Sequence, residues 1–251
     1  MTSTSSSHSP VGIDFGGSGI KGALVDLERG DFDGERSRIP TPEPSTPDAV
    51  AAVLVELLEA LGGDGPVGVT VPGVVREGVV RSAANIDPSW IGADAAAVFG
   101  TATGRRVLAL NDADAAGLAE ATYGAARGQR GLVIVTTLGT GIGSALLQDG
   151  VLVPNSELGH LEVEGRNAES HAANSAREKE DLSWEEWAER LTTYYGTVER
   201  LLSPDLFVVG GGVSKHADQF LPMVRIDTPI IPAVLRNKAG IIGAALHASR
   251  A

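Results

Sequence analysis

The stretch "VGIDFGGSGIKGALV" (residues 11–25) places an acid, a group of glycines, a hydroxyl and an amine between two apolar runs. A turn that only reversed the chain would need two residues such as Asn-Gly. Glycine tolerates positive φ and lets a ligand approach bare backbone, and successive N–H groups in such turns form anion-binding nests. We therefore interpret this stretch as a strand–turn–strand hairpin that binds phosphate.

The side chains of this hairpin fit the same interpretation. Gly16, Gly17 and Gly19 expose the backbone, while Ser18 offers a hydroxyl donor and Lys21 a compact positive charge for phosphate oxygens. The chain has no GxxxxGK[ST] motif, and no GxGxxG begins a helix after the first strand. These absences exclude a P-loop or Rossmann assignment.

Asp14, which precedes the glycines, cannot bind an anion. Its carboxylate suits the Mg²⁺ that accompanies phosphates, and we expect it to hold the ion through water. The alternative is a tight hairpin whose polar residues are incidental.

An internal repeat supports the functional interpretation. A shift of 122 positions lays "GSGIKGAL" (17–24) over "GTGIGSAL" (139–146), so that Thr140 matches Ser18 and Gly141 matches Gly19. Both copies follow an apolar run and lead into another. The repeat predicts a duplicated strand–turn–strand unit, two related lobes with a cleft between them, and two loops that grip one phosphate chain.

The composition limits the class of protein. With 251 residues, 43% hydrophobic and 21% charged, the chain is typical of a soluble globular protein of one large domain or two lobes. A net charge of −12 disfavours nucleic acid and anionic membranes as partners. The absence of cysteine excludes disulfides and thiolate zinc sites, and it fits a cytoplasmic location. Residues 1–10 lack the basic and apolar regions of a secretory signal, and we expect them to form a short disordered tail.

Strand-like runs alternate with helical patterns, which predicts an α/β fold. Thr46 can cap a helix that ends at Gly62, and Ser183 with Glu186 forms a capping box before another helix. The other expected elements are strands at 66–75, 105–112 and 204–212 and helices at 113–124 and 237–249.

Asn111 and Asp112 lie at the carboxyl end of one strand and directly before a helix, where α/β folds bind ligands. Phosphoryl transfer to an alcohol needs positioning, charge stabilisation and a carboxylate that takes the hydroxyl proton. We predict that Asp112 is this base. The alternative is that Asn111 or Asp112 only caps the following helix.

Glu157 and His160 lie close together in "NSELGHLEVEG" (155–165). One Glu and one His are a weak metal signal, whereas adjacent hydroxyls of a sugar would be bound well by a carboxylate and an imidazole. We expect the other histidines to be surface residues, namely His8, His171, His216 and His247.

The motifs "DFGGSGIKGALVD", "LNDADAAGLAE", "LGTGIGSAL", "ELGHLE" and "VVGGGVS", in this order, resemble the ROK family of sugar kinases. The resemblance covers the chain after the tail and implies the two-lobed α/β architecture of the actin/Hsp70/hexokinase-like, or ribonuclease H-like, ATPase fold. We divide the chain into a small lobe (11–111 with 237–251) and a large lobe (112–236). The family also implies a homodimer.

The resemblance further implies the roles of individual residues. It makes Asp112 the catalytic base and Asn111, Glu157 and His160 sugar ligands, with Gly73 and Asn85 beside the sugar. Of the glycines at 210–212, it places Gly211 and Gly212 at the adenosine or distal phosphate end of the donor.

The chain departs from the family after "GH". Typical members carry a CxCGxxGC zinc loop there, whereas residues 159–180 contain no cysteine, and we expect no zinc. Because "AESHAANS" still aligns with the segment after that loop, Glu169 is our choice for the last sugar carboxylate. Glu162 and Glu164 are its competitors.

The shortened loop, "NDADAAGLAE" and "AREKEDLSWEEWA" are similar to one branch of the family, the actinobacterial polyphosphate glucokinases and polyphosphate/ATP glucomannokinases. The resemblance implies a phosphotransferase with an alcohol acceptor, moving a phosphoryl group from polyphosphate or ATP to O6 of glucose, with mannose as a second acceptor. Candidates for a polyphosphate track, each equally a solvated surface residue, are Arg177, Lys179, Lys215, Arg236 and Lys238.

Two alternatives remain. The first is a glucokinase that uses ATP alone. The second is a sugar-sensing regulator, which we disfavour because Asp14 leaves no room for a preceding helix-turn-helix and the net charge opposes DNA binding.

Overall fold

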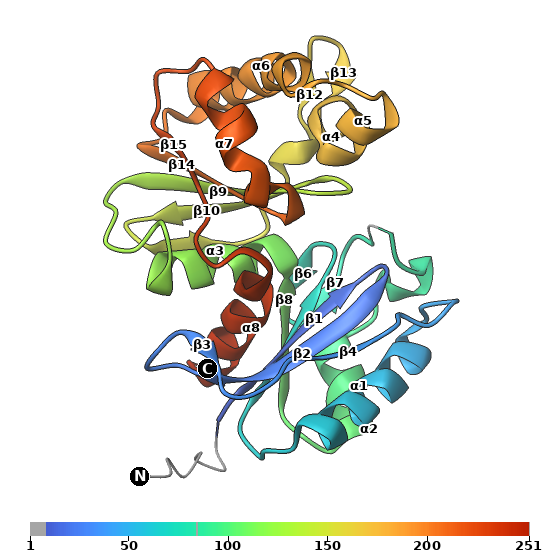
Figure 1. The fold of residues 1–251 in the computed structure, drawn as a ribbon. Coiled ribbons are helices and arrows are strands. Elements are labelled where there is room, and N and C mark those ends of the chain that lie inside the picture. Colours follow the sequence, from blue (N-terminus) through green and yellow to red (C-terminus); the bar gives the residue numbers. More distant parts are fainter. Residues whose placement is uncertain (1–8, 84, 251) are drawn as a thin grey trace. The chain divides into compact units, whose positions relative to one another are not determined.

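The computed structural model describes residues 9–83 and 85–250, which form two units (Figure 1). The first unit extends to Ala119 and takes up the chain again at Lys238, and the second is Glu120–Asn237. One boundary therefore falls inside helix α3 (Asp112–Tyr123), whereas the sequence-based division begins the large lobe at the first residue of this helix.

Most of the predicted tail lies outside the described residues, including His8. Its last two residues correct the prediction, because Ser9 and Pro10 are buried. The carbonyl of Pro10 accepts a hydrogen bond from Val25 N at 2.9 Å, and Ser9 Oγ donates to Asp33 Oδ2 at 3.1 Å. Ser9 and Pro10 are thus bound to the first unit, and the Pro10 bond continues the pairing of the first two strands.

The first unit is built on a sheet with the strand order β3-β2-β1-β5-β8, to which β4 adds by pairing with β2. Strands β1 and β2 form the predicted antiparallel hairpin, and β1, β5 and β8 run parallel. The bounds are β1 (Val11–Gly16), β2 (Gly19–Asp26), β3 (Asp31–Phe32), β4 (Ser37–Ile39), β5 (Val67–Val71) and β8 (Val107–Asn111), with a separate pair β6 (Val75–Arg76) and β7 (Val79–Val80).

Helices cover this sheet. Helix α1 (Pro47–Leu61) begins after Thr46, whose side chain accepts from Ala49 N, and Gly62 follows its last residue, as predicted.

The core of the first unit contains three buried aromatic rings. The ring of Trp90 lies between those of Phe15 and Phe99, at centroid distances of 5.6 and 5.3 Å. The remaining elements are the 3-10 helix η1 (Pro88–Trp90), α2 (Ala95–Thr103) and α8 (Ala239–Ser249).

The second unit repeats this plan, with the strand order β11-β10-β9-β14-β15. An antiparallel hairpin, β9 with β10, is again followed by parallel strands, so β1, β2, β5 and β8 correspond to β9, β10, β14 and β15. The predicted duplication is confirmed and extends to the parallel strands beside each hairpin, while the six-stranded first sheet differs from the five-stranded second sheet by β4. The bounds are β9 (Leu132–Leu138), β10 (Ile142–Gln148), β11 (Val151–Val153), β14 (Leu206–Gly210) and β15 (Ile230–Pro232).

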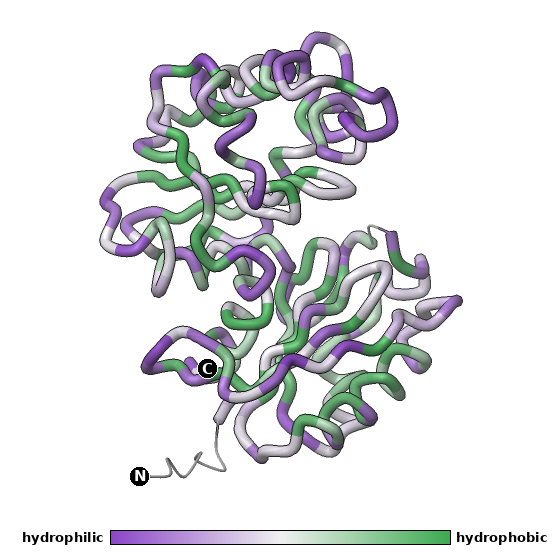
Figure 2. Tube along the Cα trace, viewed as in Figure 1, coloured by the Kyte–Doolittle hydropathy of each residue, from purple (hydrophilic) through white to green (hydrophobic). Residues whose placement is uncertain are grey.

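Helix α6 (Trp184–Leu202) is the main cover of the second sheet and starts with the predicted capping box. It buries Trp187, Tyr194 and Tyr195. Figure 2 shows hydrophobic residues along the strands of both units and hydrophilic residues in many outer loops. The smaller elements are η2 (Leu158–His160), β12 (Glu162–Val163), β13 (Arg166–Asn167), α4 (Ala168–Ala172), α5 (Asn174–Lys179), η3 (Gly212–His216), α7 (Ala217–Phe220), η4 (Leu221–Met223) and η5 (Arg236–Lys238).

In residues 9–83 and 85–250, none of the helices combines the length and the apolar character that a membrane span requires.

Helix α8 lies against β1 and β2, although these elements come from opposite ends of the chain (Figure 1). Gly12 and Gly68 are paired neighbours on β1 and β5. A Cβ on Gly12 would overlap the carbonyl of Ile241, and one on Gly68 would overlap that of Ala244. The backbone of α8 can therefore rest on the sheet only because both positions lack a side chain.

The substitution Gly12→Ala tests this packing. The added methyl must push α8 away from the sheet, so we expect the urea midpoint of unfolding to fall by the equivalent of about 1–3 kcal/mol. Gly196→Ala is the matched control, because the same methyl there would lie 3.8 Å from its nearest neighbour, inside α6. That variant should be as stable as the wild type or more so. A Gly12→Ala midpoint equal to that of the wild type would contradict the packing.

Candidate functional site

The first hairpin holds a fixed pair of opposite charges. Asp14 and Lys21 are cross-strand partners, and Lys21 Nζ lies 3.1 Å from Asp14 Oδ2. Thr70 Oγ1 donates to Asp14 Oδ1 at 3.2 Å and accepts from Phe15 N at 3.2 Å. The side chains of Asp14 and Lys21 remain 24% and 31% exposed, so both can still reach a ligand. Thr70 completes this arrangement and was missed, although "VGVT" resembles "VGID" in the sequence.

The turn of the first hairpin needs glycine for close approach and not for positive φ. None of Gly16, Gly17 and Gly19 has a positive φ. A Cβ on Gly17 would lie 3.0 Å from Asn85 O, and one on Gly19 would lie 2.7 Å from Arg38 Nε. This corrects one of our reasons for the glycines, while the bare backbone that we predicted is present.

The second hairpin has a turn that is one residue longer. Gly16 pairs with Gly19 in the first hairpin, whereas Leu138 pairs with Ile142 in the second. The start of α5 braces this turn, because Ser175 Oγ donates to the carbonyl of Thr140 at 2.6 Å.

The glycines after β14 lie beside the second hairpin. Gly211 has φ 82°, and a Cβ there would overlap the backbone of Leu138, the last residue of β9. Gly212 is exposed and follows directly. The second turn and the glycines after β14 therefore lie at the same end of the second sheet, where β9 and β14 both end. This end holds Thr140, Gly141, Gly211 and Gly212.

Asn111 ends β8 and performs the capping role that we left open. Its Oδ1 accepts from Asp114 N at 3.0 Å, and its Nδ2 donates to Gly73 O at 3.0 Å. Asp112 is the first residue of α3, and its carboxylate is partly exposed, with Oδ1 accepting from Ala113 N at 2.9 Å. Asn111 thus fixes the start of the helix and ties it to the loop at Gly73.

Gly73 and Asn85 also lie in the first unit. A Cβ on Gly73 would overlap the carbonyl of Ser82, so the loop between β5 and β6 is held close to the segment before Asn85. Asn85 adopts a left-handed conformation with φ 59°, and its carbonyl faces Gly17 of the first hairpin.

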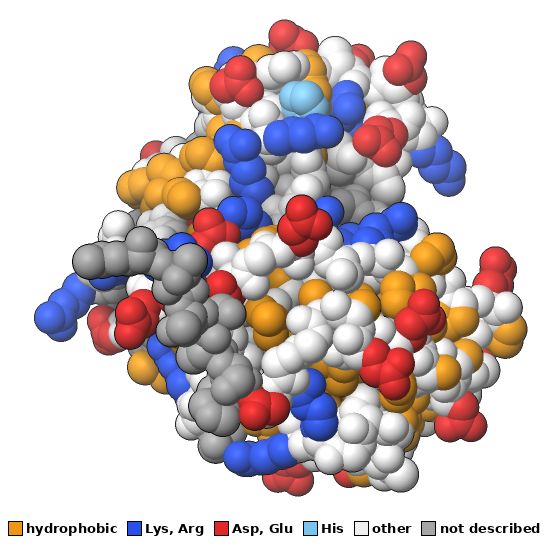
Figure 3. Space-filling view, turned by 60° about the horizontal axis from the view of Figure 1, so that its bottom comes forward, with side chains coloured by type: hydrophobic (Ala, Val, Ile, Leu, Met, Phe, Trp, Pro, Cys, Tyr) orange, Lys and Arg blue, Asp and Glu red, His pale blue; other side chains and the backbone are white. Residues whose placement is uncertain are grey.

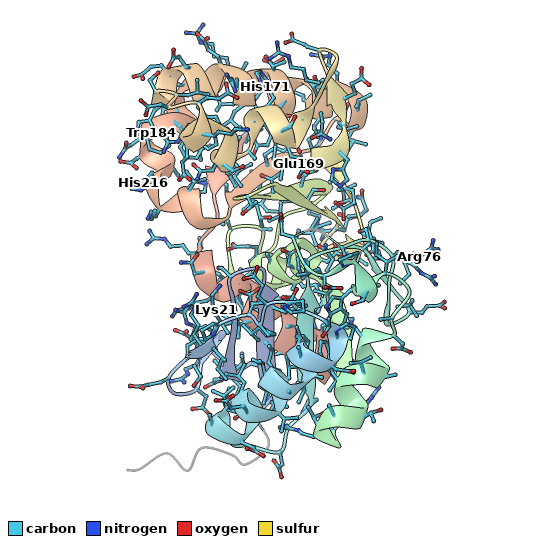
Figure 4. The ribbon with its side chains drawn as sticks, turned by 90° about the vertical axis from the view of Figure 1, so that its right-hand side faces the viewer. Lys21, Arg76, Glu169, His171, Trp184 and His216 are labelled. Carbon is cyan, nitrogen blue, oxygen red and sulfur yellow. The ribbon has the colours of Figure 1, made fainter. Side chains whose placement is uncertain are left out.

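In the second unit, Glu157, His160 and Glu169 come together. His160 Nδ1 lies 3.6 Å from Glu169 Oε1, and His160 Nε2 lies 3.9 Å from Glu157 Oε2. Glu169 also accepts from Ile142 N at 3.2 Å, which ties it to the second hairpin, close to the strands in Figure 4. Burial raises the pKa of Glu157; the positive charge of His160 opposes this rise and the charge of Glu169 reinforces it.

The competing carboxylates lie elsewhere in the second unit. Glu162 and Glu164 line a hollow of about 610 Å³ on the side of α6, together with Thr193, Gly196, Glu199 and Arg225. The geometry therefore groups Glu169, and neither competitor, with Glu157 and His160. Within the described part of the chain, no group of three or more His, Asp or Glu side chains could hold a metal ion.

The basic residues that we named as candidates for a polyphosphate track have different surroundings. Lys238 Nζ pairs with Asp31 Oδ1 at 2.7 Å, and the Arg177 guanidinium lies 3.9 Å from the centre of the Trp184 ring. Both side chains thus have structural contacts within their own units. The exposed candidates are Lys179, Lys215, Arg236 and Lys238 itself, of which only Lys238 has an ion pair among the described residues.

The three described histidines that we expected on the surface are partly buried. Burial lowers the pKa of His171 and of His247. The ring of His216 lies 5.7 Å from that of Trp184, centroid to centroid, and Figure 4 shows these two side chains on the same side of the second unit. Packing against neighbouring elements covers each ring in part, and this packing could not be predicted from the local sequence.

Comparisons with known proteins give a consistent result. The model of the ROK family matches residues 10–171. A polyphosphate glucokinase of Mycobacterium tuberculosis is 52% identical over 236 residues, covering 94% of this chain and 89% of that protein. One from Mycobacterium leprae is 49% identical, covering 97% of this chain and 75% of that protein. The crystal structure of an inorganic polyphosphate/ATP-glucomannokinase from Arthrobacter is 53% identical, with a TM-score of 0.93, covering 97% and 99% of the two chains.

Proposed function

The chain belongs to the ROK family, and we propose that it is a polyphosphate-dependent glucokinase with the actin-like hexokinase fold. It transfers a phosphoryl group from inorganic polyphosphate to O6 of glucose and forms glucose 6-phosphate. The observation that carries this proposal is the identity of about half of all residues, over nearly the whole chain, to proteins named polyphosphate glucokinases. A strictly ATP-dependent enzyme is not favoured by these relatives.

Asp112 is the base in this proposal. Its partly exposed carboxylate stands at the carboxyl end of β8, fixed by the helix start that Asn111 caps. It accepts the O6 proton as O6 bonds to the terminal phosphorus. The phosphoanhydride bond breaks, and its electron pair leaves with the shortened phosphate chain. A positioned base of this kind contributes about 10²–10⁴-fold to the rate.

The proposed sugar ligands are polar side chains. Asn111 is held by two hydrogen bonds, beside Gly73. Glu157, His160 and Glu169 provide carboxylate acceptors and an imidazole for adjacent hydroxyls. The imidazole of His160 lies 3.6 Å from Glu169 and 3.9 Å from Glu157, which is close enough for the three side chains to share one sugar.

Each glycine hairpin offers bare backbone to phosphate groups in this proposal. The acidic side chains in Figure 3 are scattered over the face shown there, so a polyanion needs local cations. Lys21 is such a cation. Asp14, fixed by Thr70 and Lys21, is a hard oxygen ligand that fits Mg²⁺, which binds through one or two carboxylates, waters and substrate phosphates. When bound, the ion neutralises charge on the phosphates.

Further parts of the proposal are ATP as a second donor and mannose as a second acceptor. The name of the Arthrobacter enzyme supports both. Homodimeric assembly and a cytoplasmic location remain predictions from the family resemblance and the lack of cysteine.

A nucleotide-free assay tests the donor. Purified protein, glucose, Mg²⁺ and polyphosphate should yield glucose 6-phosphate, followed by a coupled dehydrogenase. Chelation of the metal should abolish the product. Activity that appears only after ATP is added would contradict the polyphosphate assignment.

The base is tested by Asp112→Asn. We expect kcat to fall by about 10²–10⁴-fold, because the amide cannot accept the proton, while glucose still binds in calorimetry with near wild-type affinity. A variant that retains most of its kcat would show that Asp112 is not the base.

The last sugar carboxylate is tested by three single variants. Glu169→Gln should raise the KM for glucose by roughly 10–100-fold, because a charge-assisted hydrogen bond is lost. Glu162→Gln and Glu164→Gln are the controls and should leave this KM unchanged, since both residues line the separate hollow. The reverse pattern would assign the sugar to one of the competitors.

A further inference from the structure

Arg38 extends a row of polar side chains across the first sheet. Thr70 pairs with Asp14, Asp14 with Lys21, and Lys21 with Arg38, on the neighbouring strands β5, β1, β2 and β4. Directly paired residues project from the same face of a sheet. These four side chains, which we call the polar row, therefore share the face on which Asp14 and Lys21 meet.

The side chain of Arg38 reaches from this row to the turn of the first hairpin. Its Nη2 donates to the carbonyl of Ser18 at 3.0 Å. A Cβ on Gly19 would lie 2.7 Å from Arg38 Nε and 3.0 Å from Cζ. The guanidinium thus occupies the space that a side chain at Gly19 would fill, directly beside the phosphate-binding turn.

The charges of the row are not balanced. Lys21 is matched by Asp14, at 3.1 Å. Among the ion pairs formed by the described residues, none includes Arg38, and its side chain is exposed. In a chain with a net charge of −12, the polar row therefore carries one positive charge in excess. The planar guanidinium keeps further N–H donors besides the one bonded to Ser18, in the fork geometry that matches phosphate oxygens.

We propose that Arg38 is a donor-binding residue, whose guanidinium binds the phosphoanhydride end of the donor at the first hairpin. The proposal rests on the proposed function for the identity of the donor. Arg38 contacts the turn that contains Ser18. It would therefore bind the terminal phosphates, which polyphosphate and ATP have in common. Its contribution is to donor affinity and not to the proton transfer at the sugar.

Binding of inorganic tripolyphosphate in the presence of Mg²⁺, followed by calorimetry, tests this role without turnover. We expect Arg38→Gln to weaken binding by roughly 10-fold or more, since a charge-assisted contact is lost. Arg38→Lys should lie between that variant and the wild type, because it retains the charge and loses the fork. The control is Arg29→Gln, which removes the same charge from the ion pair with Asp26, at the opposite end of β2.

Steady-state kinetics complete the test. The KM for polyphosphate and the KM for ATP should rise by similar factors in Arg38→Gln, with the KM for glucose unchanged and a urea midpoint equal to that of Arg29→Gln. Assays of the wild type with each donor distinguish the two ways in which the proposal can fail. If the proposed function is wrong, the wild type does not use polyphosphate. If only this inference is wrong, the wild type uses polyphosphate and Arg38→Gln does so equally well. If Arg38→Gln has the same tripolyphosphate affinity and donor KM values as Arg29→Gln, Arg38 does not bind the donor. Its role would then be the structural hydrogen bond to the turn.

Discussion

The first unit depends on the contact between bare backbone on its sheet and the backbone of its last helix. Gly12 and Gly68 lie side by side on β1 and β5, beneath the carbonyls of Ile241 and Ala244. This contact joins the two ends of the chain in one unit. It also brings the start of α8 to the polar row, since a Cβ on Gly240 would lie 3.5 Å from Asp14 Oδ1. The carboxylate of Asp14, which we propose for Mg²⁺, is thus approached by the neighbouring strands and by α8.

Local signals in the sequence predict much of this fold. The caps at Thr46 and Ser183 act within a few residues of their helices, so their patterns are readable without tertiary context. The hairpin repeat is readable because the same turn chemistry occurs twice. The cap that Asn111 provides for α3 could also be predicted, because Asn111 lies between a strand and a helix. The sequence could not decide whether Asn111 caps the helix or binds a ligand.

Contacts between distant segments could not be predicted in the same way. The choice of Glu169 over Glu162 depends on which of them the fold brings beside Glu157 and His160, and a short irregular segment has no periodicity to show this. Arg38 was missed because its role depends on the pairing of β4 with β2, and β4 is only three residues long. The glycines Gly12 and Gly68 carried a readable signal, since glycine inside a strand marks close approach of another backbone.

The two copies of the hairpin share an architecture and differ in charge. The shift of 122 positions that relates them places Thr136 where the first copy has Asp14. Thr136 is buried and its hydroxyl lies 2.7 Å from that of Tyr195, whose pKa burial raises. The second copy thus has a neutral hydrogen bond in the core, between Thr136 and Tyr195, where the first copy has the ion pair of Asp14 and Lys21. The strands and turn of the second copy contain no charged residue, so we assign the proposed Mg²⁺ and the reactive end of the donor to the first copy. The second copy offers backbone N–H groups and the hydroxyl of Thr140.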